Sequence, residues 1–174
     1  MTDYEFKFEI PDTAKKALAS MTDFRGLGQR LALTMDRENE LTVNRIQRKL
    51  SGEVLNVQSS TLRRSIGATR AIVKGASILS AVGSGARFGH KSVAYAAILE
   101  FGGTTRPHVI RPRNKKVLAF PCRGGGTVFA HSVNHPGSKI PERSYIRSTL
   151  NERAINYSRA LGATVGSFLR GGVA

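Results

Sequence analysis

The segment that organises this chain begins with Tyr95-Ala96-Ala97-Ile98-Leu99-Glu100-Phe101-Gly102-Gly103 and ends with His135-Pro136-Gly137-Ser138-Lys139-Ile140-Pro141-Glu142-Arg143-Ser144-Tyr145-Ile146. Short apolar runs that are typical of strands lie between these two stretches, separated by residues that favour turns. We expect the residues before this segment to support it, and the residues after it to form a helix that starts from it. No catalytic constellation is visible in it, so function has to be inferred from shape, charge and resemblance.

Length and composition indicate one soluble domain. A chain of 174 residues with 40% hydrophobic content is long enough to bury a core. Cys122 is the only cysteine, which excludes an intramolecular disulfide framework and fits a reducing compartment. The sequence has no apolar run of transmembrane length and no secretory signal pattern, so we expect a cytosolic protein without membrane contact.

The net charge is the most unusual bulk property of the chain, at +15. Residues 1–40 carry six Lys or Arg and eight Asp or Glu, whereas residues 41–174 carry 21 and four, so the two parts have net charges of −2 and +17. A field of this size attracts polyanions and acidic protein surfaces. The alternative is a solvated basic surface without a specific partner. The absence of Trp argues against dedicated recognition of single-stranded nucleic acid.

The first fifty residues predict a strand and two helices. Residues 1–22 should form a strand over residues 4–10, where apolar and charged residues alternate, followed by a short helix. Residues 23–50 have the period of a long amphipathic helix. Leu33 and Leu41 fall outside its apolar stripe, which indicates a second covered surface, for example against another subunit. The stripe itself contains Phe24, Leu27, Leu31, Met35 and Ile46, with Val43 and Leu50 at its edge.

Residues 54–134 are expected to form a sheet-rich core with an inserted helix at residues 92–101. A loop and one helical turn lead into a hairpin whose strands, at residues 68–74 and 78–82, join around Gly75. Ser92 is the expected cap of the inserted helix and Gly102 its end. Glu100 is the only acid between Glu53 and Glu142, in a region rich in arginine. We therefore expect it to pair with an arginine, within the domain or across a subunit boundary.

The glycine-rich stretch at residues 83–92 lies where a phosphate-binding loop would lie, between a strand and a helix. Its spacing does not match a Walker motif, because His90 separates Gly89 from Lys91. It does not match the dinucleotide fingerprint either. We interpret it as a flexible basic loop.

Residues 104–134 resemble a meander of three apolar runs, at residues 109–110, 117–120 and 128–133. The first connection between runs is strongly basic, and the second is rich in glycine. Such tips either line a channel that contains DNA, grip an acidic neighbour, or are ordinary loops. Together with two residues before the hairpin, their basic side chains are our candidates for contact with DNA or an acidic partner: Arg63, Arg64, Arg111, Arg113, Lys115, Lys116 and Arg123.

The last part of the chain, residues 141–169, predicts an amphipathic helix with Pro141 at its first position. Arg143 is our candidate partner for Glu100. No metal site is expected, because His131 and His135 lie on or beside a predicted strand and Cys122 is a single thiol. No Ser–His–Asp arrangement is readable, and residues 41–174 offer few carboxylates for metal-assisted chemistry. We therefore predict no catalytic residue and no cofactor.

Several short motifs in this chain, in this order, resemble a bacteriophage family. They are Val54-Leu55-Asn56, Leu62-Arg63-Arg64-Ser65-Ile66, Tyr95-Ala96 with Glu100-Phe101-Gly102, Val117-Leu118-Ala119-Phe120, His135-Pro136-Gly137, and Pro141-x-Arg143-Ser144-Tyr145-Ile146. Their succession over residues 45–150 is similar to the minor-tail or tail-completion proteins, also called virion-morphogenesis or tail-to-head joining proteins. The family commonly has Pro-Phe where this chain has Ser144-Tyr145, a mild change within an apolar anchor.

This resemblance implies an α+β fold, here an antiparallel sheet or meander packed by a long N-terminal helix and a C-terminal amphipathic helix. It implies a ring, often a hexamer, at the head–tail neck of the virion, assembled in the host cytoplasm and without enzymatic activity. The ring would join the tail to the head connector around the DNA path. Its partners would be further copies of the chain, neighbouring neck proteins (tail terminator, connector or stopper) and genomic DNA passing without sequence recognition. The motif anchors would be Tyr95, Phe101, Gly102, Pro136, Gly137, Pro141 and Tyr145.

Three alternatives remain open at the level of sequence. A tail terminator or a head-side stopper in the same virion would share most of these features. A free-standing, non-specific DNA-binding protein would explain the basic charge, although no recognition helix is apparent. An enzyme such as a nuclease is disfavoured by the scarcity of acids.

Overall fold

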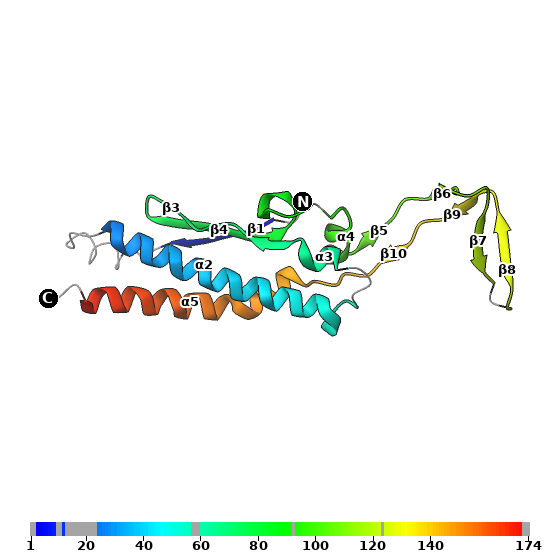
Figure 1. The fold of residues 1–174 in the computed structure, drawn as a ribbon. Coiled ribbons are helices and arrows are strands. Elements are labelled where there is room, and N and C mark those ends of the chain that lie inside the picture. Colours follow the sequence, from blue (N-terminus) through cyan, green and yellow to red (C-terminus); the bar gives the residue numbers. More distant parts are fainter. Residues whose placement is uncertain are drawn as a thin grey trace.

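The computed structural model of the chain describes residues 3–9, 12, 24–56, 60–91, 93–122 and 124–171. The fold is α+β, as the sequence predicts. Two long helices and an antiparallel sheet form a body, and a narrow arm of paired strands projects from one end of it (Figure 1).

The two long helices lie side by side and run in opposite directions (Figure 1). Helix α2 spans Phe24–Arg48 and helix α5 spans Ile146–Gly171. Leu27, Leu31 and Met35 of α2 are buried, whereas Leu33 and Leu41 are exposed, as the stripe in the sequence predicts. Helix α2 ends in an irregular turn at Lys49–Glu53, where Gly52 takes a φ of +126° that favours glycine.

The sheet of the body is built around β4, Ser77–Ser84. Strand β1 (Asp3–Glu9) pairs with one edge of β4, and β2 (Ile66–Ala68) and β3 (Ile72–Lys74) pair with the other, all antiparallel. Strand β1 and the β3–β4 hairpin around Gly75 confirm the sequence predictions. The short helix expected after β1 lies almost wholly outside the described residues.

The predicted strand at residues 68–74 is in fact two strands, β2 and β3. Between β2 and β3 the regular backbone pairing with β4 is interrupted, because side-chain oxygens accept backbone hydrogen bonds there. The Ala81 N–H donates to the Thr69 hydroxyl at 2.9 Å, and the Ala71 N–H donates to the Asp36 carboxylate of α2 at 2.7 Å. The side chains of Thr69 and Asp36 thus interrupt a strand that the apolar pattern alone shows as continuous.

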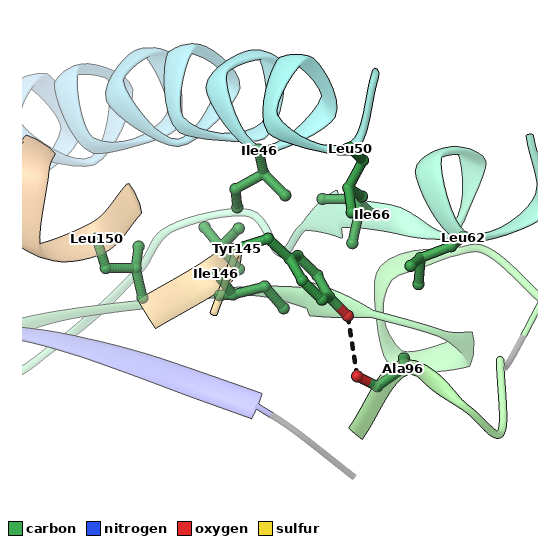
Figure 2. Close-up of a cluster of buried hydrophobic side chains, with 9 residues drawn as sticks. Ile46, Leu50, Leu62, Ile66, Ala96, Tyr145, Ile146 and Leu150 are labelled. Carbon is green, nitrogen blue, oxygen red and sulfur yellow. Dashed lines mark hydrogen bonds between the residues drawn. The ribbon is translucent and has the colours of Figure 1, made fainter. Parts of the chain in front are cut away.

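Two clusters of buried side chains hold the helices against the sheet. The cluster near the free ends of the helices contains Leu27, Leu31, Met35, Ile78, Tyr157 and Leu161. The cluster near the arm contains Ile46, Leu50, Leu62, Ile66, Val82, Ala96, Tyr145, Ile146 and Leu150, most of which Figure 2 labels. The arm therefore starts from the better populated of the two clusters.

Short elements connect the sheet to the arm. They are α3 (Thr61–Arg64), a 3₁₀ turn at Ala86–Phe88 and α4 (Ala96–Phe101). The single helical turn predicted before the hairpin is confirmed by α3. Helix α4 begins four residues later than residue 92, so the predicted start of the inserted helix is wrong. Ser92, its predicted cap, lies outside the described residues.

The arm is one long hairpin of nested strand pairs. Strand β5 (Gly103–Thr104) pairs with β10 (Lys139–Ile140), β6 (His108–Ile110) with β9 (Val133–His135), and β7 (Leu118–Pro121) with β8 (Thr127–Ala130). The predicted meander is therefore wrong, because β6 and β7 do not pair with each other. The predicted sheet-rich core at residues 54–134 is also wrong beyond residue 102, where the strands leave the body (Figure 1).

The C-terminal helix begins later than predicted, at Ile146 instead of residue 141. The reason is that residues 139–143 continue the arm into the body. Lys139 and Ile140 pair with β5, and the Arg143 N–H donates to the carbonyl oxygen of Leu99 at 2.9 Å. Helix α5 therefore starts only beyond the residues that form these bonds with α4 and β5.

Candidate functional site

The root of the arm is organised by a buried carboxylate, that of Glu100 in α4. This side chain is 0% exposed. Its Oε2 accepts hydrogen bonds from the backbone N–H groups of Tyr145 (2.8 Å) and Ile146 (2.9 Å). Its Oε1 accepts one from the backbone N–H of Arg147 (2.8 Å) and one from the Ser144 hydroxyl (2.9 Å). These N–H groups belong to the first turn of α5 and have no partner within the helix. Glu100 therefore caps α5 from a different element.

A negative charge is favoured at this position for two reasons. The N-terminus of a helix carries a partial positive charge, and hydrogen bonds to an ionised acceptor are stronger than neutral ones. We predicted that Glu100 fixes the central segment by pairing with Arg143. In the structure, the Glu100 carboxylate instead accepts hydrogen bonds from the residues Ser144 to Arg147. Arg143 donates its backbone N–H to the carbonyl oxygen of Leu99, and its side chain is exposed.

Tyr145 anchors the same junction from inside the core. Its side chain is 0% exposed and lies between Ile46 of α2, Leu50 of the turn that follows α2, and Ala96 of α4 (Figure 2). Its hydroxyl donates a hydrogen bond to the carbonyl oxygen of Ala96 at 3.1 Å, so the ring is buried without leaving its polar end unpaired. Tyr145, predicted as an anchor from the motif, thus lies at the centre of the cluster near the arm (Figure 2).

Two glycines allow the two chains of the root to approach closely. Gly102 has a φ of +70°, and a Cβ atom there would lie 2.8 Å from the backbone nitrogen of Glu142. Gly137 has a φ of +89°, and its Cβ would lie 2.2 Å from the carbonyl oxygen of Thr105. Both positions therefore require glycine. Hydrogen bonds between Thr105 and Ser138 close the pair at this point.

The other motif anchors lie on the surface around the root. Tyr95 and Phe101 are 44% and 48% exposed, and the guanidinium of Arg147 lies 5.9 Å from the centre of the Phe101 ring. Pro136 and Pro141 are exposed as well. Further along the arm, the rings of His108 and His135 stack at 5.0 Å across the β6–β9 pair. These residues define the outer surface of the root.

The arm itself exposes large apolar side chains. Val109 is 51% exposed and Phe129 is 66% exposed, and the same surface includes Ile110, Phe120 and Val128. Residues 103–140 also contain seven Lys or Arg and no Asp or Glu. The arm is thus apolar and cationic at once, and no helix or further sheet of the described residues is packed over it (Figure 1).

The structure divides the predicted basic residues between two places. Arg111, Arg113, Lys115 and Lys116 lie exposed in the connection between β6 and β7. This connection is not the hairpin tip that we predicted, because the strands beside it pair elsewhere. The glycine-rich turn between β7 and β8 is a hairpin tip, but Arg123 lies outside the described residues.

The remaining two, Arg63 and Arg64, lie on the exposed side of α3 in the body. Arg63 donates to the Ser51 hydroxyl at 3.3 Å, next to the end of α2. Arg64 lines a cavity together with residues of the glycine-rich stretch. The two groups of basic residues therefore belong to different parts of the molecule.

Sequence analysis missed a polar network between α2 and α5. Arg153 donates to the Glu38 carboxylate at 2.6 Å and to the Thr42 hydroxyl at 2.9 Å. The Tyr157 hydroxyl contacts the Thr42 hydroxyl at 2.9 Å and donates to Asn39 Oδ1 at 2.8 Å. Burial raises the pKa of Tyr157 to about 12, against the opposing effect of the bond to Thr42. The sequence signal for this network was the presence of the polar residues Asn39 and Thr42 between apolar positions of α2.

The network continues towards the arm. Lys49, which is buried, donates to the Glu152 carboxylate at 2.5 Å and to the Ser148 hydroxyl at 2.8 Å. The hydrogen bond from Lys49 holds the pKa of Glu152 below its usual range. Arg45 joins Glu152 to Glu53. The helix pair is therefore fixed in register by directional contacts as well as by apolar packing.

Within the part of the chain that the structure describes, no group of three or more His, Cys, Asp or Glu side chains is placed to hold a metal ion. Among the same residues, no helix is both long and apolar enough to cross a membrane. Comparison with known proteins found no matching family model, no matching curated protein and no matching solved structure.

Proposed function

We propose that this protein is a structural subunit of the bacteriophage head–tail neck, a tail-completion protein that forms a ring joining the tail to the head connector around the DNA path. The proposal extends the motif resemblance given above. The observation that carries it is the arm at residues 103–140, which exposes an apolar surface that none of the described residues covers. Such a surface is typical of a protein that completes its packing against another molecule.

The charge of the arm supports a ring of copies. With seven cations and no acid in residues 103–140, two arms repel each other. An arm therefore favours a different surface of the next copy, for example one that includes the acidic N-terminal part. Contacts between two different surfaces are heterologous, and they close into rings when the rotation between subunits allows it. A hexamer is the favoured stoichiometry, by resemblance.

The rigid root supports the same function. Glu100, Tyr145 and Gly137 fix the arm to the α2–α5 body, so a load on the arm is passed to the body without a flexible linker. A connector between two large assemblies needs this property. A tail terminator or stopper would share it, and those roles remain the nearest alternatives.

The test is the substitution Phe129→Ser on the exposed face of β8. In the purified chain, we expect this substitution to leave the far-ultraviolet circular dichroism spectrum and the Tm unchanged. The reason is that Phe129 does not belong to either cluster of buried side chains. In a phage genome, we expect the same change to lower the yield of infectious particles at least tenfold and to leave filled heads and free tails separate in electron micrographs.

Ser132→Ala is the matched control, because this residue is also exposed on the arm but presents no large apolar group. It should assemble as the wild type does. Joined particles at wild-type yield from the Phe129→Ser genome would contradict the proposed function of the arm.

A further inference from the structure

In the glycine-rich stretch, which the sequence predicts as a flexible basic loop, residues 85–89 form a hydrogen-bonded turn. The Gly85 N–H donates to the Ser65 carbonyl oxygen at 3.1 Å, and the Phe88 N–H donates to that of Gly85 at 3.0 Å. Phe88 is buried beneath the turn. Gly85 and Gly89 take φ angles of +115° and +77°. The bond to Ser65 and the buried Phe88 side chain therefore tie the turn to β2 and the end of α3.

This turn and α3 border an open cavity of about 500 Å³. The side chains around it are cationic or hydroxyl-bearing, and no carboxylate is among them. The lining residues are Thr61, Arg64, Ser65, Gly89, His90 and Lys91. Two full positive charges, an imidazole and the Thr61 hydroxyl thus border one space that is large enough for a phosphate group and its sugar. The Ser65 hydroxyl is already bonded to the Leu62 carbonyl oxygen and the Ser84 hydroxyl.

The position of His90 depends on the absence of a side chain on β2. A Cβ atom at Gly67 would lie 2.9 Å from the His90 ring and 3.0 Å from the Phe88 Cβ. Only glycine at residue 67 leaves room for the ring to rest on the strand. The imidazole is therefore placed by the body of the protein and does not simply hang from a surface loop.

We propose that this cavity binds a backbone phosphate of double-stranded DNA. Arginine, lysine and hydroxyl groups are the usual partners of phosphate oxygens. The lining residues include no Phe, Tyr, Trp or large aliphatic side chain, so the cavity has no large platform for a base, and we expect no sequence recognition. The choice of DNA as the source of the phosphate rests on the proposed function, which places a duplex inside the ring.

The test is the affinity of the purified full-length chain for a 30-base-pair duplex of arbitrary sequence, measured by fluorescence anisotropy across a salt series. Arg64→Ala combined with Lys91→Ala should weaken binding about tenfold at low salt and reduce the slope of log K against log salt by about 1, the value for one phosphate contact. His90→Ala alone should weaken binding about threefold.

Arg37→Ala combined with Arg159→Ala is the matched control. It removes the same charge from exposed positions of α2 and α5 that do not line the cavity. If this control weakens DNA binding as much as the cavity variant does, the affinity comes from total charge and the proposed site is wrong. A cavity variant that binds DNA like the wild type overturns the proposal as well.

Inorganic phosphate at constant ionic strength separates the two possible sources of the ligand. Competition that is lost in the Arg64→Ala, Lys91→Ala variant supports a phosphate site that DNA occupies. Phosphate binding in the cavity without any effect of that variant on DNA affinity would show that free phosphate is the ligand, and would overturn the proposal for DNA. If the Phe129→Ser genome yields joined particles while Arg64→Ala with Lys91→Ala still loses DNA affinity, the neck function is contradicted and the phosphate site stands.

Discussion

The body and the arm contain the same kind of strand, but helix α2 packs against the sheet of the body and the strands of the arm are largely exposed. In the body, Ile78 and Val82 of β4 are almost completely buried, because α2 lies across the sheet. In the arm, Val109 of β6 and Phe129 of β8 are 51% and 66% exposed, because none of the described helices covers those strands. Both regions have short antiparallel strands rich in Val, Ile and Phe. The difference is the presence or absence of a second layer.

This difference shows which region buries a core. The body buries two clusters of apolar side chains within the chain, and a polar network joins α2 to α5, although Leu33, Ile72 and Ile155 of the body stay exposed. The arm satisfies its backbone hydrogen bonds but leaves its apolar side chains in water, which is costly at about 25 cal/mol per Å² of surface that could be buried. Under the proposed function, another molecule supplies the missing layer of the arm.

The sharpest way to test the comparison is to truncate one aromatic side chain in each region. Tyr145→Ala should lower the free energy of unfolding by about 4 kcal/mol, because it leaves a cavity in the cluster at the root. Phe129→Ala should change it by less than about 0.5 kcal/mol. Urea denaturation of the isolated chain, followed by circular dichroism, measures both. Comparable losses at the two positions would show that the arm belongs to the core.

The next largest effect is expected at the junction of the two regions. Glu100→Gln replaces a carboxylate that accepts four hydrogen bonds by an amide whose NH₂ group faces N–H donors. We expect a loss of roughly 3 kcal/mol, because buried donors lose their acceptor. Differential scanning calorimetry gives the change in Tm.

Glu142→Gln is the control for this substitution. Glu142 is exposed and pairs with Arg147, one turn from the same helix end. Its removal should cost about 0.5 kcal/mol or less. An equal decrease in Tm for both variants would mean that general charge near α5, and not the buried cap, stabilises the junction.

A smaller effect concerns the polar network of the body at high pH. The folded state holds the Tyr157 proton more tightly than the unfolded state does, since burial raises this pKa from 10.0 to about 12. The resulting stability is fully present below pH 10 and is lost as the pH rises towards 12, by up to about 1.4 kcal/mol per pH unit. The stability of Tyr157→Phe should fall less steeply in this range.

The difference between wild type and Tyr157→Phe is the quantity to measure, because other tyrosines and lysines titrate in the same range. Stability curves from urea denaturation at pH 8 to 11 provide it. Parallel curves for the two proteins would contradict a buried, neutral Tyr157 in the folded state.

The body could be predicted from sequence because its signals are local. The apolar stripe of α2 and the alternation in β1 follow from helix and strand periods. The apolar runs at residues 109–110, 117–120 and 128–133 likewise predicted strands, but such runs carry no information on whether another layer covers them. The meander and the sheet-rich core were therefore assigned where the chain in fact forms an uncovered arm.

The role of Glu100 could be predicted only in part. A lone acid among arginines marked the residue as important, and Arg143 was the obvious opposite charge in the sequence. The actual donors are backbone N–H groups of Tyr145, Ile146 and Arg147. Every residue except proline has such a group, so no residue type reveals this contact. It becomes visible only when the start of α5 is known.

Amide hydrogen exchange, read by mass spectrometry, tests most directly whether another molecule covers the arm. The measurement compares peptides from residues 103–140 in the isolated chain and in purified phage particles, with peptides of α2 as the internal reference. We predict exchange at least tenfold slower over the arm in particles, and little change in α2. Equal exchange of the arm in both states would contradict the account, because the exposed strands would then have no partner in the assembly.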